Sequence, residues 1–359
     1  MKLALTVGYW GLGLDHREQA AQVIEAERCG YDSAWVAEAF GSDGASMLGW
    51  LAAQTSTIGL GAGIFQMPGR SPAMTAMTAA TLDGLTGGRF RLGLGPSGVQ
   101  VAEGFHGAPF GPQLPRTRDY VALVRMALAG RRLRYEGETI AVPRAGSESP
   151  PLRLAIRPLQ KPLPIYLAAM GPRATALAGE IADGWIPFLF APEAAPRAFA
   201  ALGEGCERAG RTTAAVEVAP VVGVCVDEDL EAARERLRPL LALYVGGMGS
   251  ARHNFYNAWA RDNGFADAAA EVQRLFLAGR RRKAAAALPA ELVDAVSLCG
   301  PAEGVRRRLG AFREAGVDTL IVWPVGATPE QRLGQVGAVA ELLRESEAIA
   351  SAPPLDSVA

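Results

Sequence analysis

Two glycine-containing segments of the sequence could hold a flat or anionic ligand against the backbone. The first, Gly93-Leu94-Gly95-Pro96-Ser97-Gly98, fits the pattern G-x-G-x-x-G and follows a predicted strand. A dinucleotide site would need a long helix next, whereas the following residues include four that break helices: Gly104, Gly107, Pro109 and Gly111. We therefore interpret the glycines either as a tight turn of a strand or as a close approach of backbone to a ligand.

The second segment, residues 168–173, lies where a predicted strand meets a predicted helix. Pro172 suits the first turn of a helix, whose exposed N–H groups can bind a phosphate. Arg173 would add a positive charge, which a nearly neutral chain must supply locally for an anionic ligand. Every loop of this kind ends at a helix N-terminus, so an ordinary loop is the alternative. Residues 61–65 end another strand in a bend, which is either a bulge or a routine loop.

Several titratable residues follow predicted strands and could donate a proton. Glu38 and Asp43 follow one strand, and Glu103 and His106 follow another. Each of these residues could have a structural role instead of donating a proton. Glu38 could accept hydrogen bonds inside the barrel, and a single histidine in a glycine-rich loop is commonly structural. The sequence shows no G-x-S-x-G motif and no Ser-His-Asp arrangement, which argues against acyl transfer.

The cysteines and histidines do not indicate a metal site. Four cysteines and three histidines are scattered along the chain without the spacing of metal ligands. We interpret each cysteine as a small apolar core residue. The basic run at residues 280–283 is typical of a solvated helix end, and the alternative is a site for a polyanionic ligand tail.

The composition excludes several classes of protein. The chain has 359 residues, of which 49% are hydrophobic and 20% charged, and this is enough apolar material for a large core. Its formal net charge of -1 provides no global field for nucleic acid or an anionic membrane. The longest uncharged stretch, residues 44–69, is interrupted by polar residues and glycines, so no transmembrane segment is expected. The N-terminus shows no leader pattern, and we expect a cytoplasmic protein.

Strand-like runs alternate with helical patterns along the chain, as they do in parallel βα units. Helical patterns follow strands one, two, three and five, at residues 16–29, 47–53, 72–85 and 173–182. The strand-like runs themselves lie at residues 3–7, 33–37, 58–64, 89–95, 164–169, 185–188, 216–226 and 319–325. Eight such units predict an α/β protein of the (β/α)8 TIM barrel class.

The spacing of the units predicts one barrel domain over residues 1–350, with two insertions and a flexible C-terminal tail at 351–359. The insertion near 111–163, after strand four, combines a helix near 119–129 with a proline-rich stretch that we interpret as an ordered or functional loop. The insertion near 227–315, after strand seven, carries helical patterns at 229–243, 251–262 and 268–277. We expect it to cap one end of the barrel.

Segments from both halves of the predicted barrel resemble the luciferase-like monooxygenase superfamily, and in particular its branch of coenzyme F420-dependent oxidoreductases. They are GYDSAWVAEAFGSD (30–43), the run from IGLGAGIF to FHGAPF (58–110), PIYLAAMGPRATALAGEIADGWIPFLF (164–190) and AGVDTLIVWP (315–324). The resemblance implies a deazaflavin ring at the barrel mouth and a homodimer. Because FMN-using relatives share this scaffold, FMN is the alternative cofactor.

The resemblance also implies which residues contact the cofactor. A non-prolyl cis peptide between Gly63 and Ile64 would form a bulge that backs the ring. The ring and phosphate contacts would carry over to Ser97, Gly98, Gln100 and Val101 after the fourth strand, and to Met170, Gly171, Pro172 and Arg173 after the fifth.

The sequence departs from the pattern of F420-dependent glucose-6-phosphate dehydrogenases. In that pattern a histidine follows the acidic residue at the end of the second strand, whereas Glu38 is followed by Ala39 and Phe40. The acidic residue near the fourth-strand glycines is also missing, with Gly98 near its place. Oxidation of a sugar phosphate is therefore not expected.

We instead expect hydride transfer from reduced F420 to an activated C=C or C=N bond of a small-molecule or peptide-like substrate. Glu38, Glu103 or His106 would supply the matching proton. Two alternatives remain, an FMN-dependent monooxygenase and a cofactor-binding protein without turnover.

Overall fold

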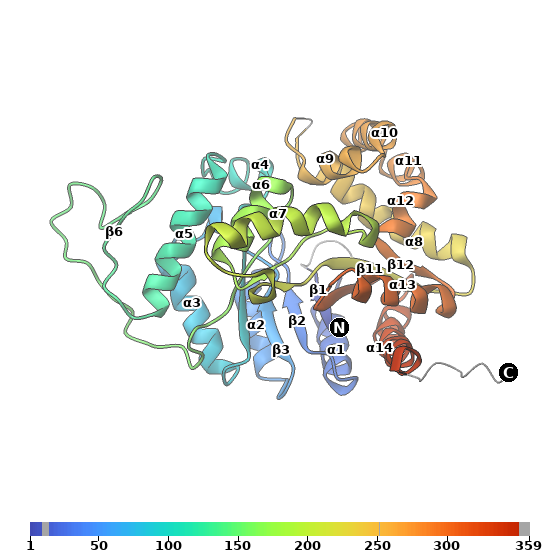
Figure 1. Cartoon of the computed structure of the whole chain (residues 1–359), viewed down its shortest axis with the longest axis horizontal. Helices are drawn as coiled ribbons and strands as arrows, with labels where there is room; N and C mark the ends of the chain where they lie inside the picture. Colours follow the sequence, from blue (N-terminus) through green and yellow to red (C-terminus); the bar gives the residue numbers. More distant parts are fainter. Residues whose placement is uncertain (9–13, 251, 352–359) are drawn as a thin grey trace.

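The computed structural model describes residues 1–8, 14–250 and 252–351. Its centre is the predicted barrel of parallel strands, with helices around it (Figure 1). Residues 352–359 of the predicted tail lie outside the described residues. The first six strands around the barrel are β1 (Lys2–Val7), β2 (Ser33–Val36), β3 (Gly59–Ala62), β5 (Phe90–Gly95), β8 (Ile165–Leu167) and β9 (Gly184–Trp185).

One bent strand closes the barrel. β10 (Glu217–Val218) pairs with β9, whereas β11 (Val221–Val226) pairs with β13 (Thr319–Pro324), which in turn pairs with β1. The sequence predicts a single strand over 216–226, and its hydrogen-bond ladder breaks because Pro220 has no N–H to donate. The N–H of Ile321 still donates to the carbonyl of Pro220, so the chain joins both edges of the sheet.

Helices flank the strands, and their starts follow the capping residues. Asp15, Asp43 and Ser71 accept hydrogen bonds from first-turn N–H groups of the helices that they precede. One helix begins at residue 113 rather than near 119, because Pro115 falls in the first turn, where a missing N–H costs little. The flanking helices are α1 (His16–Arg28), α2 (Gly44–Ala52), α3 (Pro72–Leu85), α5 (Gln113–Leu128), α6 (Pro172–Ile181), α7 (Ala195–Arg208), α13 (Ala302–Glu314) and α14 (Pro329–Ser351), with single 3-10 turns η2 (Pro192–Ala194) and η3 (Thr213–Ala215) on either side of α7.

After β5 the chain forms α4 (Val99–Ala102) and α5 and then leaves the barrel. It makes a hairpin, β6 (Tyr135–Glu136) and β7 (Ala141–Val142), within a long loop that projects away from the barrel (Figure 1). The carboxylate of Asp119 fixes the base of this loop by accepting hydrogen bonds from the Tyr135 hydroxyl and from the N–H groups of Thr139 and Ile140. The hairpin that precedes the proline-rich stretch is therefore anchored to α5.

After β11 the chain forms a helical insertion with a hydrophobic core of its own, which includes Leu237, Leu241, Val272 and Leu292. The helical patterns predicted at 229–243, 251–262 and 268–277 correspond to the first helices of this insertion. The last helices of the insertion and the short strand β12, which pairs with β11, were not predicted. The insertion consists of α8 (Leu230–Ala242), the π-helical turn η4 (Leu243–Gly247), α9 (Phe255–Asp262), α10 (Ala266–Leu277), α11 (Arg281–Ala286), α12 (Ala290–Ala295) and β12 (Ser297–Gly300).

The interior of the barrel is packed with side chains, as in other barrels of this type. The rings of Trp35 and Tyr166 pack edge to face with centroids 4.9 Å apart, and Ile186 and Ile321 belong to the same buried cluster. Among the described residues, no helix combines the length and the apolar character that crossing a membrane requires.

The carboxylate of Glu27, near the end of α1, fixes the loop that enters β3. Its Oε1 accepts hydrogen bonds from the N–H groups of Ser56, Thr57 and Ile58 at 2.8, 2.6 and 3.0 Å. Burial opposes ionisation of this carboxyl, but the hydrogen bonds to its charged form win and lower the pKa of Glu27 to about 2.

We expect Glu27→Gln to lower the free energy of unfolding near neutral pH by about 2 kcal/mol, because hydrogen bonds to a charged group contribute about 1.5–3 kcal/mol. The folded-state pKa is depressed, so the stabilisation is present above the ordinary value of 4.5 and is lost as the pH falls towards 2. Urea unfolding of both proteins measures the difference, which should fall by more than half near pH ~3. A difference that does not change with pH would contradict this role.

Candidate active site

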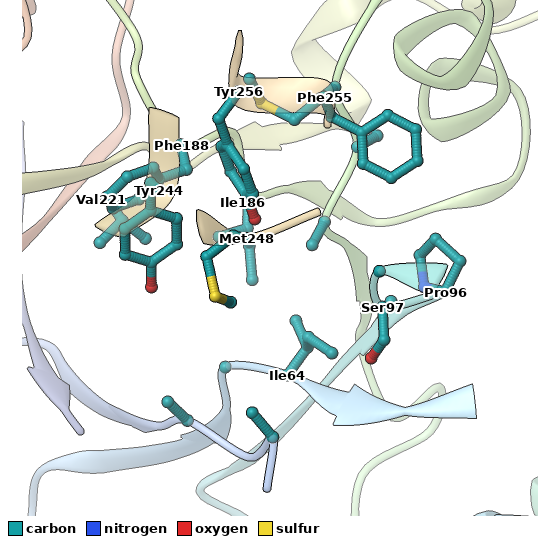
Figure 2. A pocket seen from close by; sticks show the side chains of 18 of the residues that line it. Ile64, Pro96, Ser97, Ile186, Phe188, Val221, Tyr244, Met248, Phe255 and Tyr256 are labelled. Atoms are coloured by element: carbon teal, nitrogen blue, oxygen red, sulfur yellow. The ribbon is translucent and has the colours of Figure 1, made fainter. Parts of the chain in front are cut away.

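A cavity of about 200 Å³ lies at the carboxyl ends of the barrel strands, where barrels of this type carry their active sites (Figure 2). The barrel contributes Thr6 of β1, Trp35 of β2 and the chain that follows β3 and β5. The helical insertion contributes the opposite wall, which includes Tyr244 and Tyr256. The insertion therefore covers this end of the barrel, as the sequence predicts.

A one-residue bulge forms the part of the wall that follows β3. β3 pairs with Phe90 and Arg91, and β4 (Phe65–Gln66) resumes the pairing at Leu94 and Gly95. Residues 62–64 therefore face only residues 92–93, which defines a β-bulge. The peptide bond between Gly63 and Ile64 is cis, as the resemblance implies. The Ile64 side chain projects from the bulge into the cavity (Figure 2).

The glycines of β5 make room for this bulge. A Cβ atom at Gly93 would lie 2.0 Å from the carbonyl oxygen of Ala62, and one at Gly95 would lie 2.9 Å from Cδ1 of Ile64. These glycines thus permit close approach of the protein's own backbone and of Ile64. The next helix, α4, is a single turn, so the segment lacks the long helix of a dinucleotide site.

The loop after β5 presents polar groups to the cavity. Ser97 has a φ of 59°, a left-handed conformation that is uncommon for residues other than glycine and that recurs at ligand sites. Gln100 and Gln113 also line the cavity. Oε1 of Gln100 and Nε2 of Gln113 are buried atoms without a hydrogen-bond partner among the described residues. An unpaired buried polar group is costly, and a ligand would satisfy both atoms.

The predicted cofactor residues lie in three places. Gly63, Ile64, Ser97, Gly98, Gln100, Val101 and Met170 line the main cavity. Gly171 and Pro172, at the N-terminus of α6, line an adjoining cavity of about 150 Å³ that shares Met170 and Phe188 with the first. Arg173 is exposed and lines neither cavity.

The carboxylate of Glu38 faces the cavity wall but is held by other groups of the protein. Its Oε1 forms an ion pair with Arg70 at 2.6 Å, and the carboxylate also accepts hydrogen bonds from the N–H groups of Gly44 and Gln66. Arg70 also lies over the ring of Phe65 in β4. Glu38 therefore joins the start of α2 to the strand beyond the bulge, which is the structural role that the sequence left open.

The structure does not bring the other two predicted proton donors into the cavity. Glu103 is exposed at the end of α4, where it accepts a hydrogen bond from the N–H of Phe110. The His106 ring lies against Gly69, and its Nε2 is 3.2 Å from Oε1 of Gln66. Both follow α4 rather than the strand itself, and this turn of helix carries them outside the cavity.

Aromatic side chains form the wall opposite the bulge. We call Phe188, Tyr244, Tyr256 and Trp323 the aromatic roof. Tyr244 stacks on Phe188 with ring centroids 4.0 Å apart, and the Tyr256 ring meets Tyr244 edge-on at 4.9 Å. Sequence reasoning missed these residues, because they lie far apart along the chain and the only signal was the expected position of the insertion over the barrel.

The cavity is nearly free of charge. Among its described lining residues Glu38 is the only one with a formal charge, and Arg70 neutralises it. The rest of the lining is mostly aliphatic, aromatic or small. The arrangement therefore suits a flat, largely apolar group with a few polar atoms at its edge rather than a phosphate or carboxylate.

We expect Gly93→Ala to lower the free energy of unfolding by about 1–3 kcal/mol, because the new methyl group would meet a backbone oxygen of the bulge. Gly84→Ala in α3 is the matched control, since nothing lies within 4 Å of its added methyl group. It should leave stability unchanged or raise it by up to about 1 kcal/mol. Denaturant unfolding compares the three proteins, and a Gly93→Ala variant as stable as the wild type would contradict the tight bulge.

Comparison with known proteins identifies relatives of this chain. The model of the luciferase-like monooxygenase family matches residues 8–319. A protein of Mycobacterium tuberculosis with the provisional name of coenzyme F420-dependent oxidoreductase is 39% identical over 329 residues, which cover 90% of this chain and 94% of the relative. The 5,10-methylenetetrahydromethanopterin reductase of Methanolobus tindarius is 28% identical over 317 residues, 87% of this chain and 92% of that protein.

A solved structure shows the same fold over nearly the whole chain. The coenzyme F420-dependent tetrahydromethanopterin reductase of Methanopyrus kandleri superposes with a TM-score of 0.81 at 23% sequence identity, over 96% of this chain and 98% of its own. The bulge, the family match and the similarity to the mycobacterial protein agree, and this chain belongs to the luciferase-like monooxygenase family.

Proposed function

We propose that this protein is an F420-dependent reductase that transfers hydride to an activated C=C or C=N bond of a small-molecule or peptide-like substrate. Its relatives are named F420-dependent oxidoreductases, reductases and dehydrogenases, which supports a catalytic protein over a carrier without turnover. The observation that carries the proposal is the neutral cavity between the bulge and the aromatic roof, with unpaired amide atoms of Gln100 and Gln113 at its edge.

The residues present fit the deazaflavin of F420. Such a ring is flat and apolar on its faces, and its pyrimidine edge carries both carbonyl oxygens and an N–H group. Nε2 of Gln113 can donate to a carbonyl oxygen, and Oε1 of Gln100 can accept from an N–H group. A Cβ atom at Gly98 would lie 2.9 Å from Oε1 of Gln100, so this glycine leaves room for the amide in its present position.

When bound, the cofactor supplies the hydride. The residues that would hold its ring are Gly63, Ile64, Ser97, Gly98, Gln100, Val101 and Met170. The N–H groups at the start of α6, beside Gly171 and Pro172, would hold its phosphate. Arg173 is exposed at the same helix end and offers a positive charge to the anionic tail that F420 carries and FMN lacks.

The chain's own residues prepare the cavity for hydride transfer in two ways. Ile64 and the aromatic roof bound the cavity on opposite sides, so that a bound ring would lie between them. The ion pair of Glu38 with Arg70 fixes the strand beyond the bulge and so keeps Ile64 in position. Neither carboxylate nor guanidinium is then available to an acceptor, which favours a neutral substrate over a sugar phosphate.

Two further features of the assembly belong to the same proposal. Trp50 of α2 and Met74 and Met77 of α3 are exposed apolar side chains on neighbouring helices, and a homodimer would cover them. Because residues of the helical insertion line the same cavity as the strands, we take residues 1–350 as one domain with insertions within 111–163 and 227–315, ranges that also include the flanking helices α5 and α13.

Anaerobic titration with F420, and separately with FMN, tests the proposed cofactor through the fluorescence of each. We expect micromolar or tighter binding of F420 and weak binding of FMN. Gln113→Leu should weaken F420 binding about 5–10-fold, because one hydrogen bond contributes about 1 kcal/mol. Gln54→Leu, which changes an exposed glutamine just after α2 and outside the cavity, is the matched control and should bind as the wild type does. Tighter binding of FMN than of F420 would overturn the proposal in favour of oxygen-dependent chemistry.

A further inference from the structure

Reduction of a C=C or C=N bond adds a proton as well as a hydride, and the proposed function therefore requires an acid at the cavity. The carboxylate of Glu38 is engaged by Arg70, and Glu103 and His106 lie outside the cavity. The described lining residues that can donate a proton from an oxygen or nitrogen atom then include Thr6, Ser97 and the polar members of the aromatic roof. Of these groups the phenols of Tyr244 and Tyr256 are the most acidic.

Tyr244 and Tyr256 both come from the helical insertion, and both lie over the bulge. Figure 2 shows their rings side by side, with the hydroxyl ends directed towards the open middle of the cavity and Ile64 on the opposite wall. The ring centroids of the two tyrosines are 4.9 Å apart, and Tyr244 is stacked on Phe188 at 4.0 Å. The two rings thus pack on each other and on the barrel residue Phe188, which limits their movement.

A buried asparagine joins the two segments that carry the tyrosines. The Nδ2 of Asn254 donates to the carbonyl oxygens of Tyr244 and Val245, at 3.1 and 3.0 Å. Its Oδ1 accepts from the N–H groups of Tyr256 and Asn257, at 2.9 and 3.0 Å. One side chain therefore fixes the π-helical turn η4 and the start of α9 relative to each other.

The turn that carries Tyr244 is itself unusual. A π-helical turn is rare in proteins and frequently lies at a functional site. Asn257 also reaches this turn, because its Nδ2 donates to the carbonyl oxygen of Val245 at 3.1 Å and to that of Ala269 at 2.7 Å. The buried side-chain amides of Asn254 and Asn257 therefore hold the local geometry that positions the two tyrosines.

We propose that Tyr244 and Tyr256 form the proton-donating pair of this active site, and that they hydrogen-bond the carbonyl oxygen or imine nitrogen of the acceptor. This inference rests on the proposed function. It makes the helical insertion a part of the catalytic apparatus, with Asn254 as a positioning residue.

The step balances in atoms and electrons. The acceptor carbon gains a hydride with its electron pair from reduced F420, and the π electrons of the acceptor move to its oxygen or nitrogen atom. The O–H bond of one tyrosine breaks as its proton passes to that atom, and the tyrosinate regains a proton from water. One hydride and one proton are consumed for each acceptor that is reduced. Hydrogen bonds from two phenols would stabilise the negative charge as it develops.

The variants Tyr244→Phe, Tyr256→Phe and the double variant test the pair, because each keeps the ring and removes only the hydroxyl. Tyr135→Phe is the matched control, since the Tyr135 hydroxyl bonds to Asp119 in the projecting loop, outside the cavity. Thermal unfolding and F420 titration first establish that each variant folds and binds cofactor.

The first measurement needs no turnover. Both with and without oxidised F420, tryptophan fluorescence gives the dissociation constants of cyclohexanone and of methylenecyclohexane, which have the same shape but differ in the hydrogen-bond acceptor. In the double variant we expect cyclohexanone to bind about 5–10-fold more weakly and methylenecyclohexane to bind unchanged. If the double variant has the same ratio of the two dissociation constants as the wild type, the proposed role of the tyrosine pair is wrong.

The second measurement is the rate of oxidation of reduced F420 by cyclohex-2-enone and by a cyclic imine. We expect the double variant to lose about 100-fold or more in kcat, as general acids contribute about 10²–10⁴-fold, with F420 binding and the Tyr135→Phe control unchanged. A double variant with the wild-type kcat would also overturn the pair. If the wild type binds no F420 or fails to oxidise it with either acceptor, the proposed function fails, and the ketone-to-alkene ratio still decides the role of the tyrosines.

Discussion

The site depends on the contact between the bulge at residues 62–64 and the glycines of β5. The extra residue between β3 and β4 needs space on the neighbouring strand β5. Gly93 and Gly95 of β5 have no side chains and provide that space. The bulge turns the Ile64 side chain into the cavity instead of into the barrel wall. The ion pair of Glu38 with Arg70 holds the strand just beyond it, so the barrel presents Ile64 in a fixed place.

The two sides of the cavity come from different parts of the chain. The barrel supplies the bulge, the loop after β5 and the start of α6, which are suited to a flat ring and a phosphate. The helical insertion supplies Tyr244, Tyr256 and their asparagine support, which are suited to an acceptor. In the proposed function, the barrel side would bind the cofactor, and the insertion side would bind the substrate and supply the proton.

Much of the barrel could be predicted from the sequence, because buried parallel strands and their capped helices leave local signals. The strand at 90–95 and the helix at 72–85 are examples, since a short apolar run and the Ser71-Pro72 start mark them directly. The resemblance located the cis peptide at Gly63 and Ile64, and seven of the ten cofactor residues that it implied line the cavity. The break at Pro220 was missed because it depends on which neighbour each half of the strand pairs with.

Two of the three predicted proton donors lie outside the cavity, because distance along the chain is a poor guide to distance in space. Glu103 and His106 follow a strand end closely, yet one turn of helix moves them out of the cavity, whereas Tyr244 and Tyr256 reach it from the insertion. The sequence also does not indicate that Glu38 forms an ion pair with Arg70, which lies 32 positions further along the chain.

A crystal structure of the protein with oxidised F420 and cyclohexanone would show whether the cavity holds cofactor and acceptor between the bulge and the aromatic roof. We expect the deazaflavin against Ile64, with the ketone oxygen within hydrogen-bond distance of a hydroxyl of Tyr244 or Tyr256. A ring bound away from Ile64, or a ketone whose oxygen faces neither tyrosine, would contradict this expectation.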